Sequence, residues 1–273
     1  MFARFGEDMR ITTRKEFIRG ACVALFAPPC ALWISRTSAS DGPQPVARGR
    51  EFLSGLFDPG LGLLPEYCGA KIYWLFHDNY LAAKVLARSQ PEIARRIGAK
   101  MRELGVTESG KIEMLFGEAK NPLPFRQYSL DVVAAIGEKL IKTERAVGDP
   151  LKGWEGYADL LLLASIAEAK SAPERARERF GAAMKMWDGM GLKDRAVETN
   201  GIYATYKLAL GMIAAARLDA KSAIPEEVPK RLLAMQGSEG GWITDYLPNG
   251  TQNGLANVET TCLAILGVEA FKG

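Results

Sequence analysis

Apolar and polar residues alternate along most of the chain with the spacing of helices. Four segments are apolar on nearly every side, and we expect helices over residues 72–87, 154–169, 202–216 and 257–271. Four others are apolar along one stripe, and we expect helices over residues 48–57, 91–104, 173–187 and 225–235. In a two-layered helical domain, helices of the inner layer are covered on most sides, and helices of the outer layer face water along one stripe. The alternation of these two kinds of segment is typical of such a domain.

The four apolar segments share a phrase in which an aromatic or glycine-containing turn leads into polar residues and then into the helix. The phrase stands at residues 73–83, 153–161, 201–209 and 240–264. Repeated helical units of this kind are typical of arrays that bury their core between neighbouring repeats. The sequence therefore predicts an all-α array of antiparallel helical hairpins.

Residues 108–150 interrupt this pattern. Residues 111–117 and 140–145 have the composition of strands, and the prolines at 122 and 124 force a turn between them. We expect a small β-hairpin inserted here. The alternative is one helix over residues 131–145 capped by Asp131, in which Gly137 would be unfavourable.

The first 40 residues have the pattern of an export signal. A basic stretch at residues 13–19 precedes an apolar run at 20–34, and residues 38–40 are the small residues that an export peptidase recognises. The basic stretch is similar to a twin-arginine signal, with Lys15 where the second arginine usually stands. We therefore expect a secreted or periplasmic protein with one domain over residues 41–273.

An uncleaved leader would instead anchor the protein to a membrane by its N-terminus. The apolar run is shorter than the roughly 20 residues of a comfortable membrane span, which argues against a span. A lipoprotein signal at Cys30 is less consistent, because Pro28 and Pro29 precede the cysteine. Contact with a membrane is therefore expected only through an uncleaved N-terminal segment.

The leader and the domain that follows it differ in net charge. The chain has 35 basic and 32 acidic side chains, and the leader holds six of the basic and three of the acidic ones. The remainder is balanced, with 29 of each. A nucleic-acid-binding surface needs an excess of positive charge, so no nucleic-acid partner is expected. The sequence does not indicate an oligomeric state.

Histidine and cysteine are scarce. His77 is the only histidine, and no cysteines stand at the spacing of metal ligands, so no metal or cofactor is expected. No nucleophile elbow, phosphate loop or dinucleotide fingerprint is present. Cys68 and Cys262 follow the leader, and they could form a disulfide in an oxidising compartment or remain buried thiols.

The last repeat carries a resemblance to a known group of folds. Gly240, Gly241 and Trp242, followed by residues 257–264, resemble the repeat phrase of α/α-toroid proteins, which include the six-hairpin glycosidases and the terpenoid cyclase and prenyltransferase toroids. The resemblance covers most of residues 48–271 at the level of architecture. It implies an incomplete ring whose inner helices begin around one funnel. The Asp-rich motif of the cyclases and the zinc ligands of the prenyltransferases are absent.

Side chains near the helix starts are the candidates for chemistry. We expect catalysis by three carboxylates: Asp78, Asp159 and Glu259. We expect substrate contacts from Trp74, His77, Asn79, Tyr203, Lys207, Trp242 and Asp245. Sugar rings stack on aromatic faces, and cleavage of a glycosidic bond needs two facing carboxyls. Glu259 is the strongest candidate for a general acid, because Asn257 can cap the helix in its place. This combination predicts a carbohydrate-active hydrolase or lyase.

Each of these residues also has a structural interpretation. Short polar side chains at helix starts cap free amides, and repeated tryptophans often serve as packing wedges between helices. Lys207 lies on an apolar helix, where its charged end either reaches water or points into the cleft. The alternative function is therefore a non-catalytic protein that binds a glycan or a peptide, or acts as a scaffold.

Overall fold

The computed structural model describes residues 44–106, 112–118 and 123–272. It is a mixed α/β structure, 51% helical and 19% strand, with two small sheets. The prediction of an all-α toroid is therefore wrong. Two of the missed strands are only two residues long, and the others pair with partners that the local pattern does not reveal.

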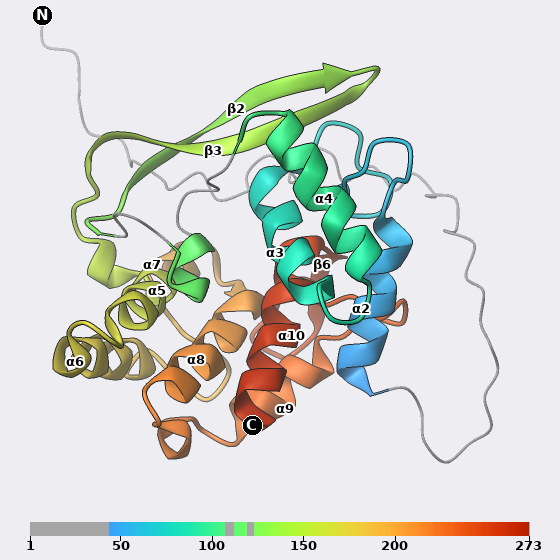
Figure 1. Cartoon of the computed structure of the whole chain (residues 1–273). Helices are drawn as coiled ribbons and strands as arrows, with labels where there is room; N and C mark the ends of the chain where they lie inside the picture. Colours follow the sequence, from blue (N-terminus) through green and yellow to red (C-terminus); the bar gives the residue numbers. More distant parts are fainter. Residues whose placement is uncertain (1–43, 107–111, 119–122, 273) are drawn as a thin grey trace, which may run out of the picture.

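Four buried helices form the centre of the molecule (Figure 1). They are α3 (Phe76–Leu86), α5 (Ala158–Glu168), α8 (Thr205–Arg217) and α10 (Val258–Lys272). Helix α10 packs between α3 and α8, and α5 packs on the other side of α8. Their sides are apolar nearly all round, as in the run of four leucines at residues 160–163 of α5, so each is covered by neighbours.

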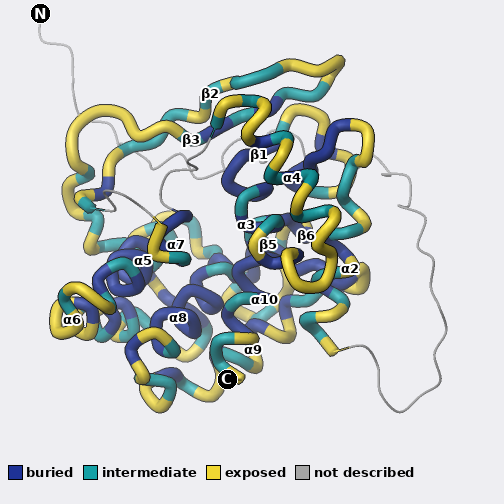
Figure 2. The backbone as a smooth tube through the Cα atoms, in the orientation of Figure 1, coloured by how far each residue is buried: buried dark blue, intermediate teal, exposed yellow. Residues whose placement is uncertain are grey.

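A second set of helices covers the first. These are α2 (Pro45–Leu56), α4 (Pro91–Glu103), α6 (Pro173–Met184) and α9 (Glu227–Ala234). Helix α4 packs on α3, α6 on α5, α9 on α8 and α2 on α10. A proline begins α2, α4 and α6, where its missing N–H leaves no hydrogen bond unmade. Figure 2 shows buried residues along the central helices and exposed residues along α6.

Short helices complete the helical part. They are the 3₁₀ turns η1 (Ile112–Phe116), η2 (Trp154–Gly156) and η3 (Lys221–Ala223), and the six-residue α7 (Arg195–Asn200). Helix α7 was not predicted. Asp194 caps it by accepting hydrogen bonds from the amides of Ala196 and Val197, and Gly201 ends it with a φ of 67°.

The first sheet contains the expected β-hairpin, and its predicted returning strand at residues 140–145 lies within the second strand of the hairpin, but the first strand is a different segment. It is formed by β1 (Trp74–Leu75), β2 (Arg126–Ile136) and β3 (Lys139–Pro150), in the order β1-β3-β2. Strands β2 and β3 pair antiparallel, and β1 joins β3 in parallel. The strand predicted within residues 111–117 is wrong for the described part, which forms η1. The alternative helix over residues 131–145 is also wrong, because Gly137 turns the chain there with a φ of 61°.

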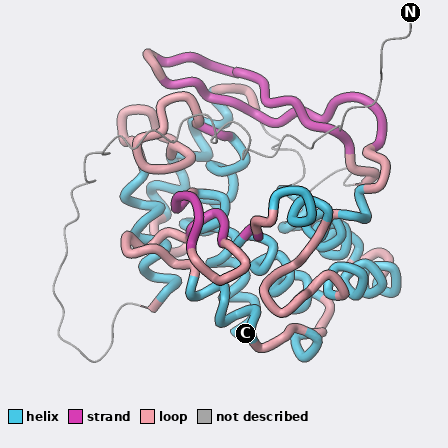
Figure 3. Tube along the Cα trace, turned by 180° about the vertical axis from the view of Figure 1, so that it is seen from behind, coloured by secondary structure: helices cyan, strands magenta, loops and turns pink. Residues whose placement is uncertain are grey.

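The second sheet was not predicted at all. Strands β4 (Tyr203–Ala204), β5 (Ile243–Tyr246) and β6 (Gln252–Ala256) pair antiparallel in that order. Both sheets are visible from behind in Figure 3. Strand β4 leads directly into α8, and β6 ends two residues before α10. The sheet therefore sets where two of the buried helices begin.

Cys262 is a buried free thiol, so of the two alternatives for this residue the buried thiol is correct and a disulfide with Cys68 does not form. Among the described residues, no helix combines the length and the apolar character needed to cross a membrane. The predicted export signal lies outside the described residues, and it stays a prediction.

Candidate functional site

Three of the four buried helices begin in the same unusual way. Their N-cap residues are Leu75, Tyr157 and Ala204, all in extended conformation, and none makes a side-chain capping bond. Asp78 and Asp159 therefore lie inside the first turn, and neither is the cap of its helix. The fourth helix differs, because Asn257 accepts a hydrogen bond of 2.9 Å from the amide of Thr260, which confirms its predicted capping role.

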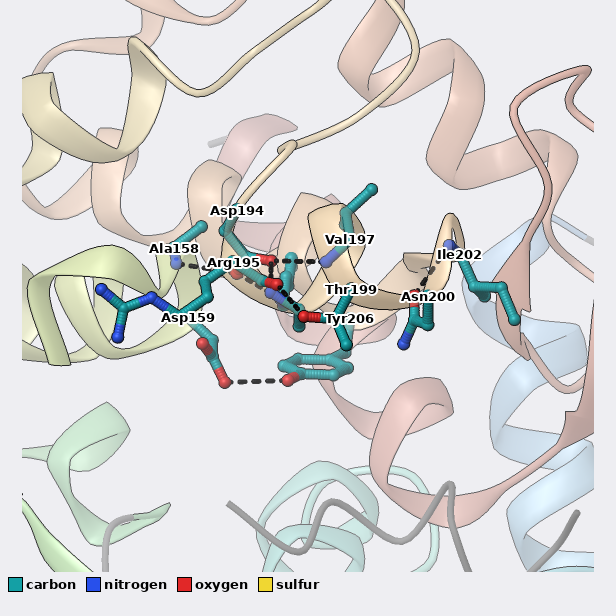
Figure 4. A network of polar contacts seen from close by, with 11 residues as sticks. Ala158, Asp159, Asp194, Arg195, Val197, Thr199, Asn200, Ile202 and Tyr206 are labelled. Carbon is teal, nitrogen blue, oxygen red and sulfur yellow. Dashed lines mark hydrogen bonds and ion pairs between the residues drawn. The ribbon is translucent and has the colours of Figure 1, made fainter. Parts of the chain in front are cut away.

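Each of these helices presents a polar residue at its second position: His77, Asp159, Tyr206 and Glu259. The hydroxyl of Tyr206 donates a hydrogen bond of 2.8 Å to Oδ2 of Asp159, which joins α8 to α5 (Figure 4). Burial, the charges of Asp159 and Glu259 and this hydrogen bond raise the pKa of Tyr206 well above its usual value. The phenol therefore stays protonated with two carboxylates near it.

Asp194, which no sequence motif indicated, links the starts of α5 and α8. Its Oδ2 accepts a hydrogen bond of 2.9 Å from the amide of Ala158, the residue before Asp159. The same oxygen pairs with the ammonium of Lys207, the residue after Tyr206. Asp194 and Lys207 are only 2% and 4% exposed, so little water competes for this ion pair. Lys207, a predicted substrate contact, is thus engaged in joining α7 to α8.

The third predicted carboxylate lies deeper. Asp78 is fully buried, and its Oδ1 is 3.5 Å from Nε2 of His77. Burial raises the pKa of the Cys262 thiol well above its usual value, and the charges of Asp78 and Glu259 raise it further. Both carboxylates therefore lie near this thiol on α10. Asp159 and Glu259 are only partly buried, which leaves them the more accessible members of the predicted trio.

Half-buried tyrosines surround the helix starts. The amide of Val258, at the start of α10, donates a hydrogen bond of 2.9 Å to the carbonyl of Glu66. The amide of Glu66 donates one of 2.9 Å to the carbonyl of Tyr73. This places Tyr67 and Tyr73 against the start of α10, and burial followed by the charge of Glu66 raises the pKa of both. Tyr157 is the N-cap residue of α5, and the ammonium of Lys142 lies over the ring of Tyr73, 4.6 Å from its centre.

Other residues that were predicted to contact the substrate instead make contacts that stabilise the fold. Asn79 accepts a hydrogen bond of 2.7 Å from the amide of Leu64 and donates to the carbonyls of Leu64 and Leu75. Trp242 is fully buried, and its indole N–H donates to the carbonyl of Leu232 at 2.8 Å.

Trp74 is 3% exposed, and its indole donates to the carbonyl of Lys71 at 3.1 Å. Tyr203 donates to Asp188 and stacks on Tyr246 with ring centres 5.4 Å apart. Asp245 lies on β5 opposite Ala204. The packing interpretation of the repeated tryptophans therefore describes Trp74 and Trp242 well.

Two features of the described residues concern places that could hold a metal ion or a small molecule. Among the described residues, no cluster of three or more His, Cys, Asp or Glu side chains could hold a metal ion. A hollow of about 210 Å³ lies between the 60–62 loop and α4, and it contains none of the predicted site residues.

Comparisons of the chain with models of protein families, with curated proteins and with solved structures found no match. Function is therefore inferred from the residues of the site alone.

Proposed function

We propose that this protein is a carbohydrate-active hydrolase or lyase whose reacting groups are Asp159, Tyr206 and Glu259. The observation that carries the proposal is the hydrogen bond of 2.8 Å between Tyr206 and Asp159, with the charge of Glu259 acting on the same phenol. These three side chains come from three helices and are partly accessible, whereas Asp78 and Asp194 are buried.

The arrangement suits proton transfer at a glycosidic oxygen. In hydrolysis, one carboxyl protonates the leaving oxygen while the other activates water or attacks the sugar carbon. In a lyase, a base removes a proton from carbon, the bond to the leaving oxygen breaks, and an acid protonates that oxygen. Tyr206 retains its proton over the physiological range, so it can donate a hydrogen bond to the leaving oxygen while a carboxyl transfers the proton. The half-buried Tyr67 offers an aromatic face for a sugar ring.

The second candidate is a non-catalytic protein that binds a glycan or a peptide. The engagement of Asp194 by Lys207 and three backbone amides favours it, because this carboxylate is structural. In that case Asp159 and Tyr206 would only orient the hydroxyls of a ligand.

The test is an activity screen of the purified protein on a panel of polysaccharides, with glycan-array binding in parallel. Glu259→Gln and Asp159→Asn should each reduce turnover by about 10²- to 10⁴-fold with little change in melting temperature. Glu138→Gln, at an exposed ion pair in the hairpin turn, is the matched control and should retain full activity. Binding without turnover would favour the second candidate, and unchanged activity in Glu259→Gln would remove Glu259 from the site.

We also propose that the protein acts outside the cytoplasm, on the strength of the leader pattern in residues 1–40. Sequencing the N-terminus of protein purified from cells tests this. A chain that begins near residue 41 in an extracytoplasmic fraction is expected. An intact Met1 in the cytosol would contradict export, and an intact leader in the membrane fraction would indicate the retained anchor.

A further inference from the structure

Arg195, the first residue of α7, places its guanidinium at the start of α5. Its guanidinium lies over the ring of Tyr157, 5.5 Å from the ring centre. Within the described part of the chain, this guanidinium makes no ion pair and no hydrogen bond. Arg179, on helix α6, also lies over an aromatic ring, 5.1 Å from the centre of Trp154. Unlike Arg195, it forms an ion pair, with Glu168 at 3.1 Å.

Two glycines make room for the Arg195 side chain. A Cβ atom on Gly156 would lie 3.1 Å from one terminal nitrogen of the guanidinium and 3.2 Å from its central carbon. A Cβ atom on Gly153 would lie 3.3 Å from the other terminal nitrogen. The guanidinium therefore rests against the backbone of this turn as well as on the ring of Tyr157. A side chain held in this way loses less conformational entropy when it binds a ligand.

The same contacts place Arg195 beside the proposed reacting group. Asp194, its neighbour in the chain, binds the amide of Ala158 at 2.9 Å, and Ala158 precedes Asp159. Tyr157, on which Arg195 lies, is two residues before Asp159. Figure 4 shows Arg195, Asp159 and Tyr206 together around the start of α5.

We propose that Arg195 binds the carboxylate of an acidic sugar, so that the site selects glycans containing uronic acids. This inference rests on the proposed function and names its substrate class. A guanidinium matches a carboxylate with two parallel N–H donors, and its planar geometry favours a fixed orientation of the sugar. The bound carboxylate would hold one sugar residue beside the start of α5, on the side of Asp159 and Tyr206.

Isothermal titration calorimetry with three sets of trisaccharides tests the inference. The first set contains galacturonic, glucuronic or mannuronic acid, the second contains the corresponding uncharged sugars, and the third contains uncharged sugars carrying sulfate esters. The unaltered protein should bind at least one uronate more tightly than its uncharged counterpart. Arg195→Gln should weaken uronate binding by about 10- to 100-fold and reduce that preference.

Two further variants distinguish the effect of the position of the Arg195 guanidinium from the effect of its charge. Gly156→Ala keeps the positive charge but displaces the guanidinium, and it should weaken uronate binding by a smaller factor than Arg195→Gln. Arg179→Gln is the matched control, because it removes a compensated arginine that also lies over an aromatic ring, and it should leave the uronate preference unchanged.

The outcomes distinguish this inference from the proposed function. Absence of uronate binding, or an equal loss of affinity for charged and uncharged sugars in Arg195→Gln, would overturn the role of Arg195. Tighter binding of sulfate esters than of uronates would overturn the choice of a carboxylate. Turnover of uncharged glycans alone would overturn the selection of uronic acids but would still support the proposed function. Uronate binding that depends on Arg195, without turnover of any polysaccharide, would support the inference and overturn catalysis.

Discussion

At the scale of single residues, the pair formed by Tyr206 and Asp159 is the feature on which the chemistry depends. Tyr206→Phe removes the hydroxyl and keeps the ring, so the packing of α8 is preserved. We expect turnover to fall by about 10²- to 10⁴-fold, the usual contribution of a positioned proton donor. Initial rates on the best polysaccharide substrate measure this effect.

Tyr246→Phe provides the comparison for Tyr206→Phe. Its hydroxyl also makes a single hydrogen bond, of 3.0 Å to the carbonyl of Met190, but it belongs to the second sheet. This variant should keep nearly full activity. Equal losses in the two variants would show that the phenol of Tyr206 acts through stability alone.

The ion pair between Asp194 and Lys207 gives a second prediction at this scale. Lys207→Met leaves a buried carboxylate without its cation, and we expect the free energy of unfolding to fall by about 3–5 kcal/mol. Asp194→Asn should also destabilise the protein, and the double variant should lose less than the two single losses together.

Chemical denaturation of all four proteins measures the coupling between Asp194 and Lys207. We expect a coupling energy of at least about 1 kcal/mol, as for other residues in direct contact. Additive losses would contradict the inference that this pair joins α7 to α8.

At the scale of elements, α2 is held to the turn between α9 and β5. Arg48 donates hydrogen bonds of 2.9 Å to the carbonyls of Gly237 and Ser238. Gly240 in this turn has a φ of 96°, and a Cβ atom there would lie 2.6 Å from the carbonyl oxygen of Arg48. We expect Gly240→Ala to destabilise the protein by about 2–4 kcal/mol through strain and overpacking.

Limited proteolysis locates the effect of Gly240→Ala. Cleavage within or next to residues 45–56 should accelerate, because the turn no longer holds α2. Gly55→Ala is the control, since Gly55 lies in α2 with no atom within 4 Å of a Cβ position. That substitution should stabilise the protein by about 0.5–1 kcal/mol. Equal protease resistance in the two variants would contradict the proposed contact.

At the scale of the whole molecule, four tyrosine hydroxyls with raised pKa values make the fold sensitive to alkali. Burial followed by the hydrogen bond to Asp188 raises the pKa of Tyr203 to about 12. Burial also raises the pKa values of Tyr80, Tyr206 and Tyr246. An unfolded chain releases these protons near pH 10, before the folded chain does. The stabilisation is therefore complete below about pH 10 and is lost as the pH rises through the folded pKa values.

Melting temperatures between pH 8 and pH 12 test this linkage. Each tyrosine should contribute a slope of about 1.4 kcal/mol per pH unit once the unfolded chain ionises. Tyr206→Phe removes one of the four, so its melting temperature should fall less steeply above pH 10. A melting temperature that stays constant from pH 9 to pH 12 would contradict the buried environment of these hydroxyls.

The sequence by itself determined where the eight longer helices of the described part lie. All eight predicted helices are present, with ends within four residues of the expected ones. Helix formation depends on the spacing of apolar residues within a few turns, and this information is local. The sequence also identified Asp159 and Glu259 near helix starts, because the repeated phrase placed them after aromatic or glycine-containing turns.

Only the tertiary structure decided the sheets and the composition of the site. Strand β4 pairs with β5 about 40 residues further along, and no local pattern records such a partner. Asp194 stands between Lys193 and Arg195 in a run of charged residues, and its role depends on Ala158, 36 residues before it. Pairing between strands and contacts between helix starts are long-range, so they are set by packing of the whole chain rather than by the pattern within any segment.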